Sequence, residues 1–191
     1  PNINKLAASG MRFTNFYAAQ AVCSASRAAL LTGCYPNRVG ISGALMPWST
    51  VALNPKEATI ASIVKTKGYA TGMIGKWHLG AKAPYLPTSY GFDEYLGLPY
   101  SNDMWPVGYD GKPITDTGSK KSKYPTLQLL DGFNPVMPIS NLEDQSKLTT
   151  IYTERAVSFI GKNKNKPFFL YLPFSMGHSP NLPSKEFAGK S

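Results

Sequence analysis

With 191 residues, 42% of them hydrophobic and 16% charged, the chain is long enough to bury a core and too apolar for a disordered protein. It contains neither a run of about 18 apolar residues that could span a membrane nor the basic and apolar segments of a signal peptide. Its net charge of +9 favours anionic partners, but no nucleic-acid recognition motif accompanies that charge, so we do not expect nucleic acid as a partner.

Two helices are expected in the first third of the chain. The small and apolar residues that follow Cys23 predict a short helix over residues 26–33, which closes at a glycine. The sequence NPKE at 54–57 is typical of a helix start, with an asparagine cap, a proline at the first position and a capping-box glutamate. We expect this second helix to end at Gly68. Its apolar face would consist of Ile60, Ile63 and Val64.

Strands are expected at 69–74 and 168–173, with a long helix before the second strand. Asn141 is the candidate N-cap of that helix. The run FFLYLP at 168–173 is continuously apolar, as expected for a strand buried on both faces. Residues 81–140 are rich in Gly, Pro and Ser, which predicts long irregular connections of the kind that line sites. The apolar face of the long helix would consist of Leu148, Ile151, Tyr152, Ala156, Phe159 and Ile160.

This alternation of strands and helices predicts an α/β fold, with a mostly parallel sheet flanked by helices. In such sheets, ligands bind beyond the carboxyl ends of the strands. The loop GKWHLG at 75–80 follows the first predicted strand, and FSMGHSP at 174–180 follows the last one. These loops contain His78 and His178, the only two histidines of the chain, so we expect both at one site beside Lys76.

Cys23 is placed at or just before the start of a predicted helix, where backbone N–H groups and the helix dipole favour negative charge. Arg27 adds a cation one turn later, which suits a thiolate or a bound oxyanion. A cysteine-phosphatase loop would have more residues between the two and more glycines, so the sequence disfavours that reading. A Cys23–Cys34 disulfide remains open, although a helix between the two cysteines would disfavour it.

The sequence CSASR at 23–27, followed by AALLTG, resembles the signature of the type I sulfatases, Cys-x-Pro/Ala-x-Arg with a Leu-Thr-Gly tail. Other segments are similar to family segments in the same order, and the likeness is greatest to the arylsulfatase A branch. Together they cover essentially the whole chain. They are PNINKLAASGMRFTNFYA at 1–18, GKWHLG at 75–80, GFDEYLGLPYSND at 91–103 and PFFLYLPFSMGHSP at 167–180.

The resemblance implies an alkaline-phosphatase-like fold and the hydrolysis of a sulfate monoester. It also implies that a maturation enzyme, such as a formylglycine-generating enzyme, oxidises Cys23 to the aldehyde formylglycine. One hydroxyl of the hydrated aldehyde would attack sulfur, and the second would later lose its proton and expel sulfate. Arg27 would steady the formylglycine and its charge.

The resemblance gives roles to four further residues. Lys76 would contact sulfate and the hydrate, and His78 would hydrogen-bond the hydrate and help to deprotonate it. Ser101 would bind a sulfate oxygen, although without the resemblance it would read as an ordinary turn hydroxyl. His178 would lie on the leaving-group side and donate a hydrogen bond or a proton.

The sequence departs from the family pattern at two positions. Ala25 replaces the commoner proline, which is an accepted variant, and Cys34 stands where arginine is common, which removes an expected structural contact. The resemblance implies a divalent metal, usually Ca²⁺, held by an Asp-Asp pair and an Asp-Asn pair. Neither pair occurs in this chain, so Cys23, as formylglycine, is the only metal contact expected from it.

We therefore expect residues 1–191 to form an internal part of an N-terminal catalytic sulfatase domain, without its first strand and its C-terminal part. Such a piece should be inactive alone. Two other functions stay open. One is a phosphoesterase or phosphonate-ester hydrolase on the same fold. The other is a catalytically inactive basic protein that binds sulfated polysaccharide.

The expected substrate is a sulfated small molecule or a sulfated glycan. Three aromatic residues are candidate stacking surfaces for a sugar or an aryl group, and packing explains each of them equally well. Family members work outside the cytosol, so we expect an extracytoplasmic location, periplasmic or secreted, with the lysosome as an alternative. The absence of any Asn-x-Ser/Thr acceptor favours a bacterial source. The three aromatic residues are Trp105, Tyr109 and Tyr124.

Overall fold

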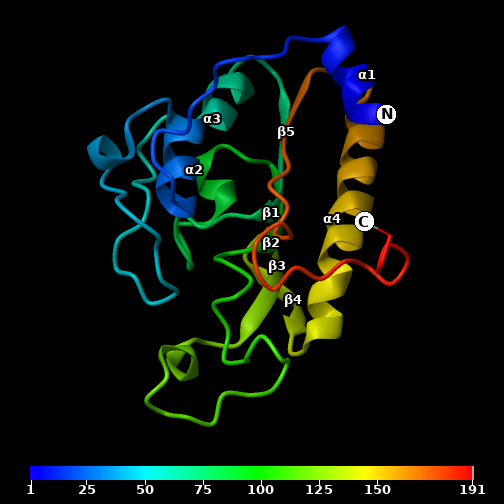
Figure 1. Cartoon of the computed structure of the whole chain (residues 1–191). Helices are drawn as coiled ribbons and strands as arrows, with labels where there is room; N and C mark the ends of the chain where they lie inside the picture. Colours follow the sequence, from blue (N-terminus) through cyan, green and yellow to red (C-terminus); the bar gives the residue numbers. More distant parts are fainter. Residues whose placement is uncertain (191) are drawn as a thin grey trace.

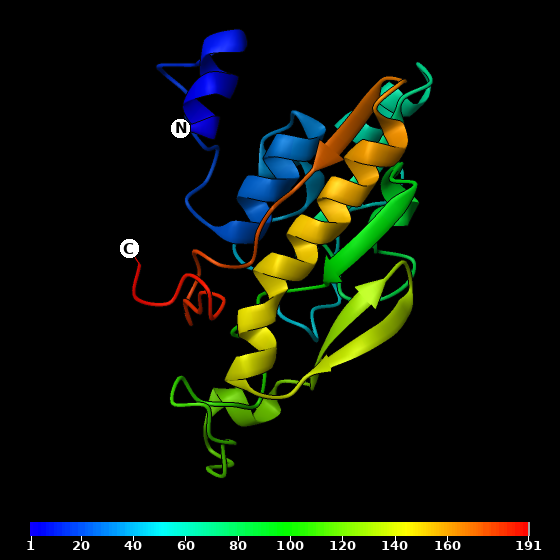
Figure 2. The ribbon, with the colours of Figure 1, turned by 90° about the vertical axis from the view of Figure 1, so that its right-hand side faces the viewer.

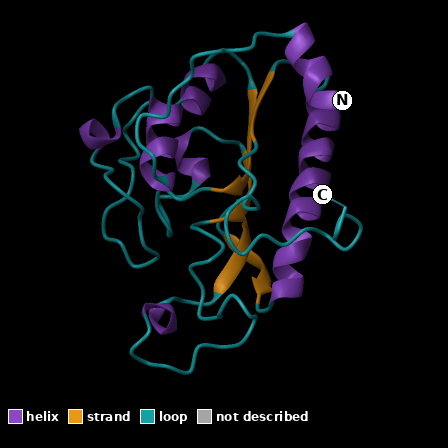
Figure 3. Ribbon diagram, in the orientation of Figure 1, coloured by secondary structure: helices purple, strands orange, loops and turns teal. Residues whose placement is uncertain are grey.

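The computed structural model describes residues 1–190, which form a five-stranded sheet with helices on both faces (Figures 1 and 3). The strand order is β4-β3-β2-β1-β5. β1 pairs in parallel with β2 and β5, whereas β3 pairs antiparallel with β2 and β4. The α/β class is confirmed, with a mixed sheet. The strands are β1 (Ala70–Lys76), β2 (Glu94–Leu98), β3 (Leu127–Asp131), β4 (Asn134–Ile139) and β5 (Phe168–Tyr171).

Helix α4 covers one face of the sheet, and α2 and α3 cover the other (Figures 1 and 2). Helix α1 lies away from the sheet and has no buried residue. Within residues 1–190, every helix is too short or too polar to span a lipid bilayer. The helices are α1 (Asn2–Ser9), α2 (Cys23–Thr32), α3 (Ile60–Lys65) and α4 (Leu142–Asn163), and the 3₁₀ turns are η1 (Pro36–Val39), η2 (Pro87–Tyr90) and η3 (Lys120–Lys123).

Two of the three predicted helices agree with a predicted cap at one end. α2 starts at Cys23, three residues before the predicted start at 26, and closes at the predicted Gly33, whose left-handed backbone lets its N–H donate to the Ala29 carbonyl. α4 starts after Asn141, whose side-chain oxygen accepts a 2.9 Å hydrogen bond from the Asp144 N–H. The helix then runs to Asn163.

The predicted start of α3 is wrong. The helix begins at Ile60 because Thr59 and Ser62 form a complete capping box, in which each side chain bonds the backbone N–H of the other. The sequence at 54–57 forms a turn instead, in which Asn54 accepts from the Lys56 N–H. The predicted apolar face is wrong at Ile63, which is 56% exposed, whereas Ile60 and Val64 are half-buried and Ala61 is the buried residue.

The expectation of irregular structure over residues 81–140 is wrong, because three of the five strands lie there. β2 and β3 are short and are held by their neighbours in the sheet. β4 contains Pro135 and Pro138, which an edge strand tolerates because one side of its backbone needs no partner. β5 was expected to be buried on both faces, but it lies at the other edge and is only half-buried.

Two hydrophobic cores lie on the two faces of the sheet because successive strand residues point to opposite sides. Met73 of β1 packs with α2 residues such as Leu31, and its neighbour Ile74 packs against α4. Most of the predicted apolar face of α4 is confirmed by burial, but Ile160 is 42% exposed. The fully or largely buried members of that face are Leu148, Tyr152, Ala156 and Phe159.

Three strands approach one another unusually closely at the carboxyl end of the sheet. Gly75 of β1 pairs with Gly97 of β2, and a Cβ atom on Gly97 would lie 1.8 Å from the Gly75 carbonyl oxygen. A Cβ atom on Gly75 would lie 2.1 Å from the Pro173 carbonyl oxygen, beyond β5. Both positions therefore require glycine. The residues that follow these strands are brought together by this narrow end of the sheet.

We predict that Gly97→Ala destabilises the protein by about 3 kcal/mol or more, because the added methyl group meets backbone that cannot move aside. Gly161→Ala is the matched control, since Gly161 lies within α4 with open space around it. That change should stabilise the protein by up to about 1 kcal/mol. Equilibrium unfolding in urea measures both, and equal stabilities for the two variants would contradict the close approach.

Candidate active site

The last residue of β1, Lys76, and His78 just beyond it lie between the extensions of the two neighbouring strands. The Lys76 N–H donates to the Pro173 carbonyl at 2.9 Å, and the His78 N–H donates to the Pro99 carbonyl at 3.1 Å. His78 has a φ angle of 64°, in the left-handed region that non-glycine residues adopt only at a cost. Backbone of this kind persists where surrounding contacts hold it, which is common at functional sites.

Cys23 is the first residue of α2 and is half-buried. Both cysteines are free thiols, so the open question of a Cys23–Cys34 disulfide is answered against it. The N-cap of the helix, Val22, offers no side-chain acceptor to the free N–H groups of the first turn. Cys23 therefore lies where the helix has unsatisfied donors and a positive end.

Arg27 connects this helix to the sheet. Its guanidinium group donates to the main-chain carbonyl of Lys76 and, at 3.4 Å, to the hydroxyl of Tyr171. The start of α2 is also held by Ser24, whose hydroxyl accepts a hydrogen bond from the Leu45 N–H at 3.0 Å. The N-terminal half of α2 is thus tied to β1 and β5 by Arg27 and to Leu45 by Ser24, and Cys23 lies close enough to Lys76 to act on its pKa.

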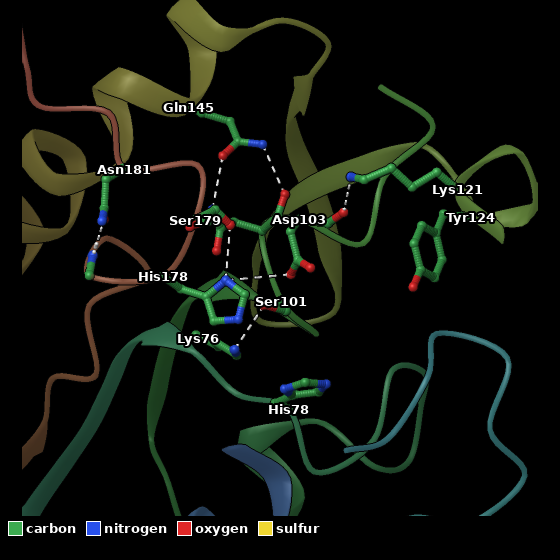
Figure 4. Close-up of polar contacts among 12 residues, drawn as sticks. Lys76, His78, Ser101, Asp103, Lys121, Tyr124, Gln145, His178, Ser179 and Asn181 are labelled. Carbon is green, nitrogen blue, oxygen red and sulfur yellow. Dashed lines mark hydrogen bonds and ion pairs between the residues drawn. The ribbon is translucent and has the colours of Figure 1, made fainter. Parts of the chain in front are cut away.

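Lys76 and Ser101 form a buried polar pair, exposed by only 2% and 1%. The Lys76 ammonium group donates to the Ser101 hydroxyl at 2.9 Å (Figure 4). The pKa of Lys76 is lowered to about 8, mainly by burial and in part by Arg27, while Cys23 and Asp103 oppose the shift. Lys76 is therefore a cation below about pH 8 and neutral above it.

His78 is buried and neutral. Its Nε2 lies 2.7 Å from the Leu45 carbonyl oxygen, which assigns the proton to that nitrogen, and its Nδ1 has no hydrogen-bond partner in residues 1–190. Burial, followed by the charge on Lys76, lowers the pKa of His78 to about 3. An unprotonated, unpaired Nδ1 in this setting is a proton acceptor without a partner.

His178 reaches the same place from the loop after β5. Its Nδ1 lies 2.9 Å from the Ser179 carbonyl oxygen and 3.7 Å from Asp103 Oδ1, and 46% of its side chain is exposed. Figure 4 shows it beside Lys76, Ser101 and Asp103. The expectation that the two histidine loops meet at the carboxyl edge of the sheet agrees with this arrangement.

The turn that carries Ser101 is anchored to α4 and to η3. Asn102 and Gln145 bond reciprocally, the Asn102 amide to the Gln145 side-chain oxygen at 3.1 Å and the Gln145 amide to the Asn102 carbonyl at 2.9 Å. The Lys121 ammonium group donates to the Asp103 carbonyl at 2.8 Å. Sequence reasoning missed Asp103, and the only signal for it was its place two residues after Ser101 in PYSND.

The three candidate stacking residues have different surroundings. Trp105 is 1% exposed, so packing explains it. Tyr109 is exposed and lies under the Lys121 ammonium group, 4.7 Å from the ring centroid. Tyr124 stacks on Trp48 with ring centroids 5.3 Å apart, and Trp48 is 48% exposed. Tyr109 and the Trp48 face of the stacked pair are therefore the aromatic surfaces that a ligand could reach.

The described residues do not make a metal site by themselves. Residues 1–190 contain no group of three or more His, Cys, Asp or Glu side chains placed to hold a metal ion. The cations Arg27 and Lys76 beside Cys23 would instead favour an anion.

A protein-family model described as Sulfatase matches residues 1–191, which is the whole chain. The chain belongs to the sulfatase family. Human arylsulfatase A is 35% identical over an alignment that covers all of this sulfatase chain and 39% of the human protein. This confirms the likeness to the arylsulfatase A branch. The sulfatase chain spans only 34% to 39% of the length of such curated relatives.

Solved structures share the fold. The PsFucS1 sulfatase from Pseudoalteromonas sp. gives a TM-score of 0.85 at 33% identity, over 100% of this sulfatase chain and 41% of that protein. The Ps i-CgsB structure in complex with k-i-k-neocarrahexaose gives a TM-score of 0.73 at 33% identity, over 94% of this chain and 40% of that one. The alkaline-phosphatase-like fold expected from the resemblance is thereby confirmed.

We predict that the complete protein binds inorganic sulfate more weakly as the pH rises through about 8, because Lys76 then loses its charge. Lys76→Arg should remove this pH dependence, since arginine stays charged, and Lys76→Met should weaken binding at every pH. Lys166→Met, at an exposed lysine, is the matched control. Calorimetric titration at several pH values measures this, and the same decline in Lys76→Arg would assign it to another group.

Proposed function

We propose that the complete protein hydrolyses a sulfate monoester to an alcohol and inorganic sulfate, and that Cys23, after conversion to formylglycine, provides the nucleophile. The observation that carries this proposal is the placement of Cys23 at the positive end of α2, beside the buried Lys76–Ser101 pair. Two histidines with different surroundings complete the site.

Hydrolysis of a sulfate ester first requires positive charge and hydrogen-bond donors that bind the sulfuryl oxygens. Lys76 and Arg27 supply positive charge, the Ser101 hydroxyl supplies a donor, and the first N–H groups of α2 face the same region. Because Lys76 and Ser101 are buried and already paired, little reorganisation is needed when an anion arrives. Preorganised donors of this kind stabilise charge that develops on oxygen in a transition state.

The nucleophile requires a proton acceptor. When Cys23 is converted, the hydrated aldehyde supplies one hydroxyl for attack on sulfur and a second for the later release of sulfate. His78 is suited to accept a proton, because its Nε2 proton is held by the Leu45 carbonyl and its Nδ1 is free and neutral. Arg27 fixes the first turn of α2 through its bond to the Lys76 carbonyl.

The leaving alcohol requires a proton donor. His178 differs from His78 in being partly exposed and in facing a carboxylate, Asp103, rather than a lysine. A histidine of this kind can carry the proton that the departing oxygen needs. The family resemblance supports the same division of roles between these two histidines.

Calcium is part of the proposal for the complete protein only. The family resemblance implies Ca²⁺, and Cys23, as formylglycine, is the one contact that this chain would offer. Since residues 1–190 contain no cluster of metal-ligating side chains, we derive no step of the reaction through the ion.

A sulfated glycan is the substrate class that we propose, and a formylglycine-generating or equivalent enzyme is the maturation partner. Two observations support the glycan. The Ps i-CgsB neighbour was solved with a neocarrahexaose, and the exposed Trp48–Tyr124 stack offers a face for a sugar ring. The family resemblance supports an extracytoplasmic location.

Conversion of Cys23 is the first test. We expect the tryptic peptide from Phe13 to Arg27 of the complete protein, made with a maturation enzyme, to carry the mass of an aldehyde in place of the thiol. Cys34, in another peptide, is the internal control and should keep its thiol. An unmodified Cys23, where a known sulfatase is converted in parallel, would argue against the proposed nucleophile.

The rates of hydrolysis of an aryl sulfate and an aryl phosphate distinguish a sulfatase from a phosphoesterase. We expect the converted protein to hydrolyse an aryl sulfate faster than the matching aryl phosphate, and Cys23→Ala to reduce sulfate release by about 10³-fold or more. Faster phosphate release, retained in Cys23→Ala, would favour the phosphoesterase. Salt-sensitive glycan binding without turnover of either ester would favour the inactive binding protein.

A further inference from the structure

Asp103 lies next to His178 at this site, on the turn that also carries Ser101. Its Oδ1 atom is buried and has no hydrogen-bond partner in residues 1–190. The nearest cation-forming group to that atom is His178, whose Nδ1 lies 3.7 Å away. A carboxylate oxygen that lacks a hydrogen bond in a buried place is costly unless a charge or a ligand compensates for it.

The other charged and titratable groups around Asp103 are engaged elsewhere. Lys76 donates to Ser101, and the Lys121 ammonium group is held by the main-chain carbonyls of Asp103 and Val107. His78 is neutral, with its proton on the Leu45 carbonyl. Burial, and to a smaller extent Asp103, raises the pKa of Tyr124, so this group is uncharged. His178, with its Nδ1 3.7 Å from Oδ1, is therefore the group whose ring the carboxylate is best placed to orient.

The position of Asp103 is fixed from behind. The neighbouring Asn102 is fully buried and bonds reciprocally with Gln145 of α4, and Lys121 holds the Asp103 carbonyl from the other side. Figure 4 shows this turn between α4 and the histidines. The carboxylate is thus presented to His178 by a rigid turn, while His178 itself stands on a more exposed loop.

We propose that Asp103 is a positioning residue for His178, which holds the Nδ1 edge of the ring and stabilises the imidazolium so that Nε2 can protonate the leaving oxygen. The inference rests on the proposed function. Nδ1–H is directed to the Ser179 carbonyl at 2.9 Å, with the Asp103 Oδ1 atom 3.7 Å from the same nitrogen, and Figure 4 draws Nε2 on the side of Lys76. As the S–O ester bond breaks, the Nε2 proton passes to the departing oxygen, and His178 is left neutral with its Nδ1 proton in place.

The test compares two esters that differ in how much they need an acid. Phenyl sulfate has a poor leaving group, whereas the 4-nitrophenolate of 4-nitrophenyl sulfate leaves with little protonation. We expect Asp103→Asn in the complete, converted protein to lower kcat about a hundredfold for phenyl sulfate and about threefold at most for 4-nitrophenyl sulfate. Asp110→Asn is the matched control, because Asp110 is exposed and is paired only with Lys112, and it should match the wild type with both esters.

A double variant tests whether Asp103 acts through His178. His178→Ala should show the same selective loss with phenyl sulfate, and adding Asp103→Asn should change that rate by less than about twofold. Formylglycine content, measured by peptide mass, normalises every rate, and the melting temperature is compared with that of the wild type.

Two results would overturn this inference and leave the proposed function standing. They are an equal loss with both esters, with or without a lowered melting temperature, and losses that multiply in the double variant. A converted wild-type protein that releases sulfate from neither ester would instead overturn the proposed function, and this inference with it.

Discussion

The close approach of β1, β2 and β5 at their carboxyl ends fixes the backbone of Lys76 and His78, around which the other polar groups of the candidate site gather. Gly75 and Gly97 leave no room for a side chain between these strands, and backbone hydrogen bonds to the neighbouring segments continue beyond β1 as far as His78. Lys76 is the last residue of β1, and His78 is held just beyond it by the Pro99 carbonyl. Ser101 and Asp103 follow β2 at the same level, and the loop of His178 follows β5.

Burial within this framework gives similar residues different properties. Lys76 remains a cation at neutral pH although burial lowers its pKa to about 8. Burial, followed by the charge on that cation, keeps His78 neutral, whereas His178 faces a carboxylate and is partly exposed. The same residue type is thus placed in two different surroundings within one site.

The sequence predicted the parts of the site that depend on local signals. Cys23 was placed at a helix start by the small and apolar residues after it, and the two histidines were placed at one edge by the rule for strand ends. β2, β3 and β4 could not be predicted in the same way, because they are short, lie among Gly and Pro, and depend on pairing with neighbours.

Other misses have equally physical causes. Two cap-like sequences precede α3, and the capping box of Thr59 and Ser62 prevails over the turn at 54–57. Asp103 was missed because its placement depends on the bond between Asn102 and Gln145, which are 43 residues apart in the sequence. A contact over such a separation leaves no periodic or local pattern to recognise.

The left-handed backbone at His78 means that the residue proposed for activity is not the residue that would give the greatest stability at this position. A glycine or an asparagine would adopt that backbone with less strain, and a smaller neutral side chain would also relieve the burial of polar nitrogen. Variants chosen for heat resistance alone would therefore tend to lose the histidine. The same selection would replace Lys76 by an apolar residue of similar length, because the buried cation costs folding energy at neutral pH. A screen for stability alone would thus select against Lys76 and His78, which are the residues that the proposed reaction needs.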